Sequence, residues 1–457
     1  MMIQRAENSA RRPRPADRPR FRPGPWLALY SAALAVRVIY AWLAGGPRAL
    51  PSPDAVAYDA IAWQLARGAG FSLPGAGGHD PTAIVPPVVP WLASLVYRAA
   101  GHQFFDALLL QCAIGALVPL LLAGYAQSVF GGRVGRTAGW LAAAHPLLVR
   151  FCCDLLPETT FTALMLVAFT ASAAWVKAPR PGRALGVGLT WGVASLARPA
   201  ALLLPVVVAA WAWVPVGLTV PARERMRQTS LLLLGLALAI GLWTLRNALV
   251  LRAFVPITTG GGRALLDGNN DLVWNDPRLR GDEISTAHIE PYASEVRGRS
   301  EPEAEALARR RAWAFLAAHG SEWPAMAAAK LARFWRVTSG GGAWLTPGGP
   351  GSPLARRLAV IDPLLVWSVL TWPFTAWGLV QTLRGPRRFY QGLGFLVVVY
   401  FTTLAIVSSG ALRMRIPVEP MLVLFAAVGF EDARRRLRMR ARALRVIVGR
   451  SGATRAV

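Results

Sequence analysis

Charged residues are scarce in this sequence, and acidic residues are the scarcest. Only 16% of the 457 residues are charged, where a soluble domain has roughly 25%. Aspartate and glutamate number 24, hydrophobic residues make up 54% of the chain, and the mean hydropathy is +0.38. The hydrophobic residues come in long runs, and a run of about 18 or more is typical of a membrane-spanning helix. The composition therefore excludes an ordinary soluble domain.

The alternation of apolar and polar residues that marks membrane β-barrel strands is missing as well. Backbone groups in lipid must satisfy their own hydrogen bonds, so helices and closed barrels are the structures that cross a membrane. The sequence therefore predicts an all-α polytopic membrane protein with about ten transmembrane helices. We expect the spans at residues 26–44, 104–128, 137–151, 157–176, 184–197, 199–217, 229–250, 359–383, 389–408 and 413–430.

Cysteine is rare too, since the chain has only Cys112, Cys152 and Cys153. All three lie in or beside apolar runs, and their spacing fits neither a zinc site nor a disulfide framework. We therefore interpret them as small apolar packing residues.

Positive charge is what the chain has in excess. The net charge is +26, nearly all from arginine, and a basic chain invites a nucleic-acid hypothesis. The arginines gather at the two chain ends, each next to an apolar run, and in four short connections: Arg133/Arg136, 177–183, 223–227 and 384–388. Counting spans from a cytoplasmic N-terminus puts all these segments inside, as the positive-inside rule requires. We expect membrane lipids as partners, no nucleic acid, and cytoplasmic N- and C-termini.

The spans divide the chain into five segments. We expect a disordered basic cytoplasmic arm (1–24), an N-terminal transmembrane module (25–250), a large external loop (251–357), C-terminal transmembrane helices (358–430) and a basic cytoplasmic tail (431–457).

A first external loop lies within the N-terminal module, at residues 46–103. Its segment Asp54–Arg67 has helical spacing, and the Pro-rich segment Val85–Tyr97 is apolar but short. A short apolar segment of this kind fits a helix that lies at the membrane interface.

A few acids fall at the ends of spans on the external side, where charge is costly and marks function. The predicted topology gathers these polar residues on one face of the membrane: Asp54, Asp59, His79, Asp80, Asp154 and Glu158. Asp154 and Glu158 would share a helix face if the turn between them is helical. Structural roles remain open: a helix N-cap for Asp54, turn chemistry for His79 and Asp80, and a helix-dipole partner for Glu158.

Several arginines also lie on the external side, which the positive-inside rule depletes. These are Arg198, Arg246, Arg413 and Arg415. Guanidinium groups bind phosphate oxygens with paired hydrogen bonds, so we expect an anionic, phosphorylated ligand beside the acids. Anchoring at the membrane interface is the alternative.

Five stretches, read together, resemble one family. They are Asp54-Ala-Val-Ala-Tyr58 through Gly68-Ala-Gly70-Phe71, Pro81-Thr82-Ala83 through Pro86-Pro87-Val-Val-Pro90, Leu196-Ala-Arg198-Pro199, Trp243-Thr-Leu-Arg246-Asn247, and Arg413-Met-Arg415-Ile-Pro417-Val-Glu-Pro420. Their order over residues 26–430 resembles the GT-C glycosyltransferases, in the branch of the protein O-mannosyltransferases and lipid A aminoarabinose transferases. The sequence departs from many relatives at Ala55, where a second acid often follows Asp54, and at Val85, where an arginine often precedes the paired prolines.

The resemblance implies a GT-C-like helix bundle and an inverting sugar transfer from a polyprenyl-phosphate donor. Its first-loop acid makes Asp54 the expected general base or acceptor-orienting group, with a second acid to come from Asp80, Asp154 or Glu158. Arg198, Arg246 and Arg415 are expected on the donor phosphate. Tyr58, His79 and Asp154 complete the expected substrate-binding residues.

The resemblance leaves the acceptor open among lipid, glycan and protein, and it implies no certain cofactor, with a divalent cation at the external acids left open. It implies a multi-pass protein of the inner or plasma membrane. A transporter or lipid flippase is the first alternative, although transporters place charged groups near the midplane of repeated, broken helices. A non-catalytic membrane scaffold is the second.

Overall fold

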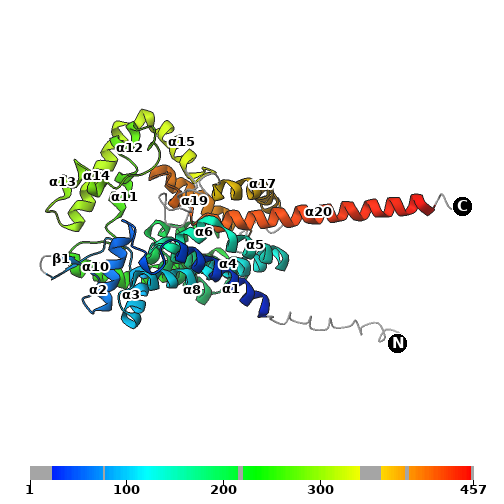
Figure 1. The fold of residues 1–457 in the computed structure, drawn as a ribbon, viewed down its shortest axis with the longest axis horizontal. Coiled ribbons are helices and arrows are strands. Elements are labelled where there is room, and N and C mark those ends of the chain that lie inside the picture. The colour runs from blue at the N-terminus through cyan, green and yellow to red at the C-terminus, as the bar shows by residue number, and fades with distance from the viewer. Residues whose placement is uncertain (1–22, 76–77, 215–219, 340–361, 386–390, 454–457) are drawn as a thin grey trace.

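The computed structural model describes residues 23–75, 78–214, 220–339, 362–385 and 391–453. Long helices lie side by side in one bundle, and a second group of helices, α11–α15, packs at one end of it (Figure 1). At the opposite end α1 begins and α20 leaves the bundle. Within the described ranges the sheet content is one two-stranded hairpin, so the predicted all-α class is confirmed.

The bundle contains most of the helical residues that the structure describes. Its helices are α1 (Gly24–Leu43), α4 (Phe104–Phe130), α5 (Gly132–Ala144), α6 (Pro146–Arg150), α7 (Pro157–Lys177), α8 (Pro181–Ala197), α9 (Leu204–Trp211), α10 (Ala222–Leu251), α17 (Pro363–Arg384), α19 (Leu393–Val407) and α20 (Glu419–Ala453). Short 3₁₀ turns η2 (Phe151–Cys153), η3 (Pro199–Ala201) and η7 (Leu412–Arg415) connect some of them.

Two groups of elements lie at the end of the bundle that we call the loop end. Between α1 and α4 are η1 (Gly46–Arg48), α2 (Ala55–Ala66), strands β1 (Ser72–Gly75) and β2 (Gly78–Pro81), and α3 (Val88–Ala100). After α10 come α11 (Gly261–Asp267), α12 (Asp271–Asn275), η4 (Thr286–His288), α13 (Tyr292–Val296), α14 (Glu301–Ala318), η5 (Gly320–Glu322) and α15 (Trp323–Phe334). We call this second group the extramembrane helices. Three consecutive glycines at 340–342 predict a flexible break, and they lie outside the described residues.

Five described helices are long and apolar enough to cross a membrane: α1, α4, α7, α10 and α17. The other predicted spans also fall on helices, but α8 has 17 residues and α19 has 15, and the apolar part of α20 is only its start. The count of about ten spans therefore stays a prediction.

Proline explains two differences from the predicted boundaries. The expected single span at 137–151 breaks at His145, which is extended because Pro146 follows it. The interfacial helix expected at Val85–Tyr97 begins only at Val88, after Pro86 and Pro87, for the same reason.

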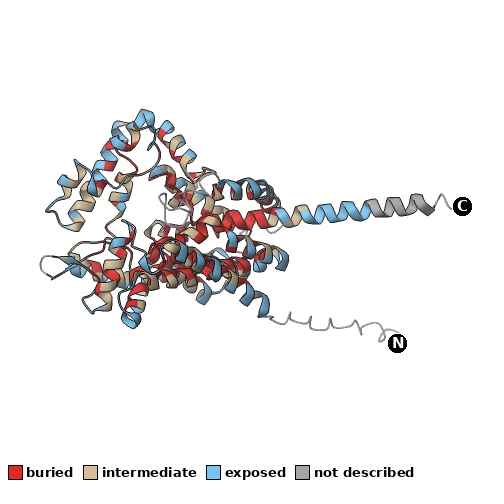
Figure 2. Cartoon of the chain, in the orientation of Figure 1, coloured by how far each residue is buried: buried red, intermediate tan, exposed pale blue. Residues whose placement is uncertain are grey.

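Small residues let the helices of the bundle pack closely. A Cβ added to Gly188 of α8 would lie 1.9 Å from the carbonyl oxygen of Leu232 in α10, and one added to Gly378 of α17 would lie 1.8 Å from that of Phe425 in α20. Glycine at such crossings is common in membranes, where van der Waals packing holds helices together. Figure 2 shows the buried residues gathered in the middle of the bundle and exposed residues on α20 where it leaves the bundle.

The extramembrane helices are tied to the loop that follows α19. The Gly410 amide donates to the Gly281 carbonyl at 2.8 Å, and the Asn269 side-chain amide donates to the Val407 carbonyl at 3.0 Å. Lys330 of α15, which is 3% exposed, donates to the Asn269 side-chain oxygen at 2.6 Å. These contacts fix the loop that carries Arg413.

Burial of Lys330 makes the stability of this docking depend on pH. Burial lowers the pKa of Lys330 to about 8 from 10.5. Above pH 8 the folded state loses this proton, while the unfolded chain keeps it up to about 10.5, so stability rises with pH across that window by at most about 3 kcal/mol. Below pH 8 the burial cost is present in full.

Thermal unfolding of the wild type and of Lys330→Met, followed from pH 7 to 10.5, measures this effect. The wild type should gain stability relative to the variant only above pH 8. Parallel profiles for the two proteins would show that Lys330 carries no such cost.

Candidate active site

Asp54 opens α2 at the loop end. It occupies the N-cap position, but its side chain makes no capping hydrogen bond, so the N-cap interpretation of its side chain is wrong. The Ser52 hydroxyl accepts from the Ala55 amide instead, at 3.3 Å. The Asp54 carboxylate pairs with the Arg413 guanidinium and is 54% exposed, so it is open to an incoming molecule.

A buried ion pair lies behind Asp54. Glu158 follows Pro157 in the first turn of α7, where the helix dipole favours an acid. Its Oε1 atom lies 3.1 Å from Nη1 of Arg198, and the two side chains are 1% and 7% exposed. Arg198 stands at the end of α8, before Pro199. Neither carboxylate oxygen of Glu158 nor Nη1 of Arg198 makes a hydrogen bond, so the pair holds unused bonding capacity.

Arg413 joins these residues into one cluster. Its Nε atom lies 3.8 Å from Glu158 Oε1 and 3.6 Å from Glu283 Oε1, while its Nη1 pairs with Asp54. Burial alone would lower the pKa of Arg413, but the carboxylates of Glu158, Glu283 and Asp54 raise it above its usual value. We call Asp54, Glu158, Arg198, Glu283 and Arg413 the charged cluster.

Two more residues border the charged cluster. Tyr58, one turn after Asp54 on α2, is 8% exposed, and burial together with the charge of Glu158 raises its pKa. Asp154 accepts from the Leu155 amide at 3.0 Å, and burial raises its pKa. Asp154 and Leu156 are both extended, so Asp154 and Glu158 do not share a helix face.

A divalent cation does not fit the charged cluster as it stands. Among the described residues, no group of three or more His, Cys, Asp or Glu side chains is arranged to hold a metal ion. The carboxylates of Asp54, Glu158 and Glu283 instead converge on the Arg413 guanidinium.

His79 and Asp80 are not brought to the charged cluster. Both lie on β2, where they are exposed and pair in register with Pro74 and Leu73 of β1. No described contact joins them to Asp54 or Glu158. The structure therefore places Asp80 on the β1–β2 hairpin and not at Asp54, and its role as a second acid stays a prediction.

Arg246 donates hydrogen bonds to the backbone of the first loop. Its guanidinium donates to the carbonyls of Phe71 at 2.7 Å and Thr82 at 2.6 Å, and it lies over the rings of Phe71 and Trp243. The structure therefore gives Arg246 the position of a loop clamp and not of a phosphate ligand.

Replacing Arg246 with glutamine should loosen this loop. Losing two charge-assisted hydrogen bonds, each worth about 1.5–3 kcal/mol, should speed amide hydrogen exchange at residues 71–84 by about tenfold or more. Arg297→Gln is the matched control, since Arg297 is 78% exposed and has only a 3.8 Å pair with Glu290. Equal exchange at 71–84 in both variants would remove the clamp role.

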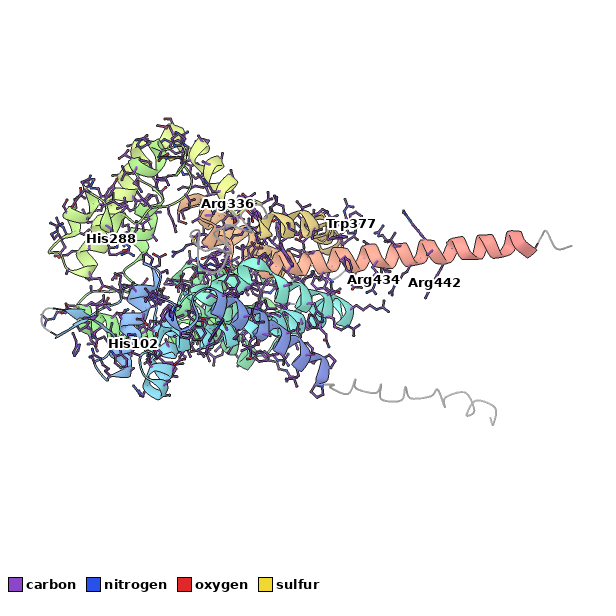
Figure 3. The ribbon with its side chains drawn as sticks, in the orientation of Figure 1. His102, His288, Arg336, Trp377, Arg434 and Arg442 are labelled. Carbon is purple, nitrogen blue, oxygen red and sulfur yellow. The ribbon has the colours of Figure 1, made fainter. Side chains whose placement is uncertain are left out.

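Arg415 also lies away from the charged cluster, in a buried network of its own. Its Nε donates to Glu419 Oε1 at 2.6 Å, and its Nη1 donates to the carbonyls of Phe334 and Arg336. His145 contacts the other oxygen of Glu419 at 3.1 Å. Arg336 lies where the extramembrane helices meet the bundle (Figure 3), so Arg415 fixes the segment that presents Arg413 two residues earlier.

Comparisons with known proteins identify this architecture. Residues 84–244, about a third of the chain, match the model of the family described as dolichyl-phosphate-mannose-protein mannosyltransferase. The comparison with curated proteins gives no match. Among solved structures, the archaeal oligosaccharyltransferase AglB from Archaeoglobus fulgidus, in complex with an inhibitory peptide and a dolichol-phosphate, superposes with a TM-score of 0.55 at 14% identity, over 92% of this chain and 51% of that one. The same enzyme in complex with Zn and sulfate gives 0.54 at 13% identity, over 93% and 51%.

The chain has a GT-C-like fold. It spans about half the length of the oligosaccharyltransferase structures it matches. ArnT from Cupriavidus metallidurans, bound to undecaprenyl phosphate, matches at a TM-score of 0.40 and 15% identity, over 90% of this chain and 78% of that one. With this fold and five helices long and apolar enough to cross a bilayer, the chain is an integral membrane protein.

Within this GT-C-like fold, Glu283 completes the charged cluster without any signal in the sequence, and Arg413, one of the external arginines, takes the position expected for Arg415. Arg413 stands in the same motif as Arg415, and the spacing does not say which of the two faces Asp54. Glu283 lies among many acids of the extramembrane segment with no pattern to distinguish it. The depletion of arginine on the external side was the available signal for Arg413.

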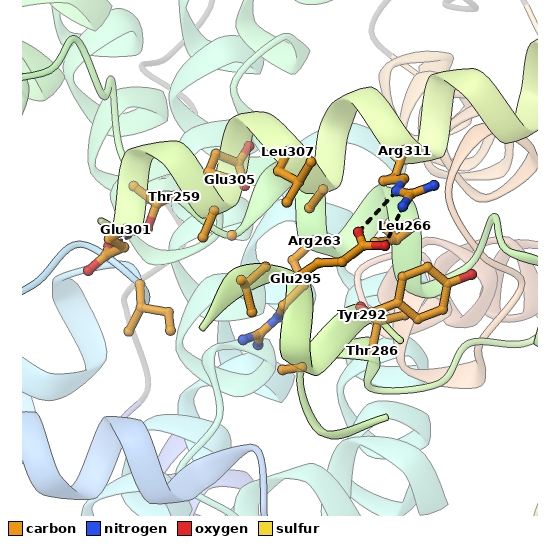
Figure 4. Close-up of a pocket in the computed structure, with 16 residues that line it drawn as sticks. Thr259, Arg263, Leu266, Thr286, Tyr292, Glu295, Glu301, Glu305, Leu307 and Arg311 are labelled. Atoms are coloured by element: carbon orange, nitrogen blue, oxygen red, sulfur yellow. Dashed lines mark hydrogen bonds and ion pairs between the residues drawn. The ribbon is translucent and has the colours of Figure 1, made fainter. Parts of the chain in front are cut away.

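A separate cavity of about 200 Å³ lies among the extramembrane helices of the GT-C-like fold (Figure 4). Its walls are formed by α11, α13, α14 and nearby turns, and Ile84 of the first loop closes one side. Glu301 links this region to the first loop, because it accepts from the Thr82 hydroxyl at 2.7 Å and the Ala83 amide at 2.9 Å. None of the charged-cluster residues lines this cavity.

Proposed function

We propose that this protein is an inverting glycosyltransferase that moves a sugar from a polyprenyl-phosphate donor to an acceptor. The observation that carries the proposal is the charged cluster at the loop end of the GT-C-like bundle. In it a half-exposed carboxylate, Asp54, lies beside the partly exposed Arg413 and the buried Arg198. The family match over residues 84–244 supports the same class. So does the dolichol-phosphate held by the oligosaccharyltransferase whose fold the chain shares.

The carboxylate and the guanidinium groups of the charged cluster have different roles in this reaction. As the acceptor oxygen attacks the anomeric carbon, Asp54 takes the proton from the acceptor group. The bond between the anomeric carbon and the phosphate oxygen breaks on the opposite side, which inverts the configuration. The polyprenyl phosphate leaves with the bonding electrons, and the guanidinium groups of Arg198 and Arg413 stabilise the added negative charge.

The other residues of the site have supporting roles in this proposal. Glu158 orients Arg198 and Arg413. Tyr58 and Asp154 border the charged cluster next to these residues. Arg246 and Arg415 position the first loop and the segment after α19. The base and the phosphate ligands need no group from His79 or Asp80.

We propose the orientation that the arginine distribution predicts. The termini would lie in the cytoplasm and the loop end on the opposite face of the cell membrane. The acceptor, whether lipid, glycan or protein, would approach Asp54 from the side of the extramembrane helices.

Incubation of the purified protein with a panel of polyprenyl-phosphate sugars and candidate acceptors tests the proposal. The expected result is release of free polyprenyl phosphate together with glycosylated acceptor. If donor lipid instead crosses the bilayer of proteoliposomes intact, the protein is a flippase. If the donor is neither consumed nor moved, a scaffold role is favoured.

A further inference from the structure

The charged cluster has the composition of a cation site, with a protein cation already in its middle. Three carboxylates from three different parts of the chain reach one guanidinium group. Asp54 comes from the start of α2, Glu158 from α7, and Glu283 from the extramembrane segment before η4. All three lie within ion-pair distance of Arg413.

The geometry leaves the carboxylates committed to arginine. A divalent ion needs its ligand oxygens at about 2.0–2.6 Å, but Arg413 Nε lies among them, 3.8 Å from Glu158 Oε1 and 3.6 Å from Glu283 Oε1. Glu283 is held from its other side, since its Oε2 accepts from the Ser409 hydroxyl at 2.5 Å. A metal ion could enter only by displacing the Arg413 guanidinium.

The charge balance matches that of a metal site. Arg413 and Arg198 together bring two positive charges to Glu158, Glu283 and Asp54, which is the charge that one divalent ion would bring. Nε of Arg413 and Nη1 of Arg198 are buried donors without a hydrogen-bond partner. They remain available to a phosphate oxygen, which is one of the tasks of a metal ion in phosphate chemistry.

We propose that the guanidinium of Arg413 occupies the position that a divalent cation would occupy, and that, together with the guanidinium of Arg198, it performs the electrostatic role of that cation. It fixes Asp54 beside the reacting centre and offers positive charge to the departing phosphate. The inference rests on the proposed function for its role in transfer, but the occupancy of the cation position by arginine can be tested without any transfer assay.

Binding of Mn²⁺, measured by electron paramagnetic resonance on the full-length protein, is that test. The wild type should show no Mn²⁺ binding that depends on Asp54. Arg413→Ala should bind Mn²⁺ at least tenfold more tightly than the wild type, because three carboxylates lose their shared counter-charge. The double variant Arg413→Ala/Asp54→Asn should lose this gain.

Arg311→Ala is the matched control. Arg311 is also an arginine paired with a carboxylate, but it pairs with Glu295 alone, at the surface, so its removal should create no Mn²⁺ site. If Arg413→Ala does not fold, Arg413→Gln is used in the same measurement, because it keeps a neutral side chain in place.

The outcomes separate the two proposals. Wild-type Mn²⁺ binding that disappears in Asp54→Asn would overturn the inference, and so would a folded Arg413 variant that gains no Mn²⁺ affinity. Where transfer is observed, an excess of EDTA should leave its rate unchanged. Loss of that rate with EDTA and its recovery with Mn²⁺ would overturn the inference while leaving the proposed function intact.

Discussion

Replacing Asp54 with asparagine is expected to lower the rate of sugar transfer by about 100-fold or more, because a positioned general base contributes about 10²–10⁴-fold. Asparagine has nearly the same shape but cannot take the acceptor proton. The Asp54 side chain is half exposed and makes no capping bond, so the variant should fold normally. Release of polyprenyl phosphate under single-turnover conditions measures the effect.

Asp80→Asn is the informative companion variant. Both aspartates are candidates from the sequence, but Asp80 lies on the hairpin away from the charged cluster. We expect near wild-type transfer in Asp80→Asn. An equal loss in both variants would contradict the assignment of the base to Asp54, and full activity in Asp54→Asn would remove Asp54 from the mechanism.

Replacing Glu158 with glutamine should have the largest effect on stability. The change leaves the buried Arg198 facing a neutral side chain. Removal of one partner from a buried ion pair costs about 3–5 kcal/mol, because the remaining charge is left uncompensated. Thermal unfolding in detergent, with ligand absent, should show a clear drop in the midpoint temperature.

The double variant Glu158→Gln/Arg198→Met separates charge from packing. Removing both charges leaves no uncompensated ion, so much of the lost stability should return. Transfer should stay low, since the arginine assigned to the phosphate is gone. A Glu158→Gln variant as stable as the wild type would show that the buried pair is not a structural requirement.

Long-range patterns in the sequence predicted the frame of this molecule well. Apolar runs separated by basic connections predicted the helix bundle, and the structure places the beginning of α1 and the outer part of α20 at one end, with the extramembrane helices at the other. These features depend on the free energy of transferring side chains from water to lipid. That free energy is set almost entirely by the residues of each segment itself, so it can be estimated from the sequence. The local breaks at Pro146 and Pro87 were harder to weigh, because a helix interrupted by proline still has an apolar composition.

The site was predictable only in part. Asp54 and Glu158 were found because acids near apolar runs are rare, and both lie in the charged cluster. The arginines were harder, because a guanidinium at a span end can bind a ligand, a carboxylate or a backbone carbonyl. Arg246 donates hydrogen bonds to the carbonyls of Phe71 and Thr82, and Arg415 donates to Glu419. Only the folded arrangement distinguishes these partners from a phosphate.

The extramembrane helices and their connections help to build the charged cluster. They contribute Glu283 to the charged cluster, and through Gly281 and Asn269 they hold the loop that leads to Arg413. Their docking is therefore coupled to the geometry of the site. A change that loosens Lys330 and its neighbours should act on transfer through the position of Arg413.

A structure of the protein bound to a non-hydrolysable polyprenyl-phosphonate sugar tests the central claim most directly. The account predicts phosphonate oxygens within hydrogen-bond distance of Arg198 or Arg413, with the anomeric carbon facing Asp54. A sugar phosphonate seated elsewhere, such as beside Arg415 or in the cavity between α11 and α14, would contradict it.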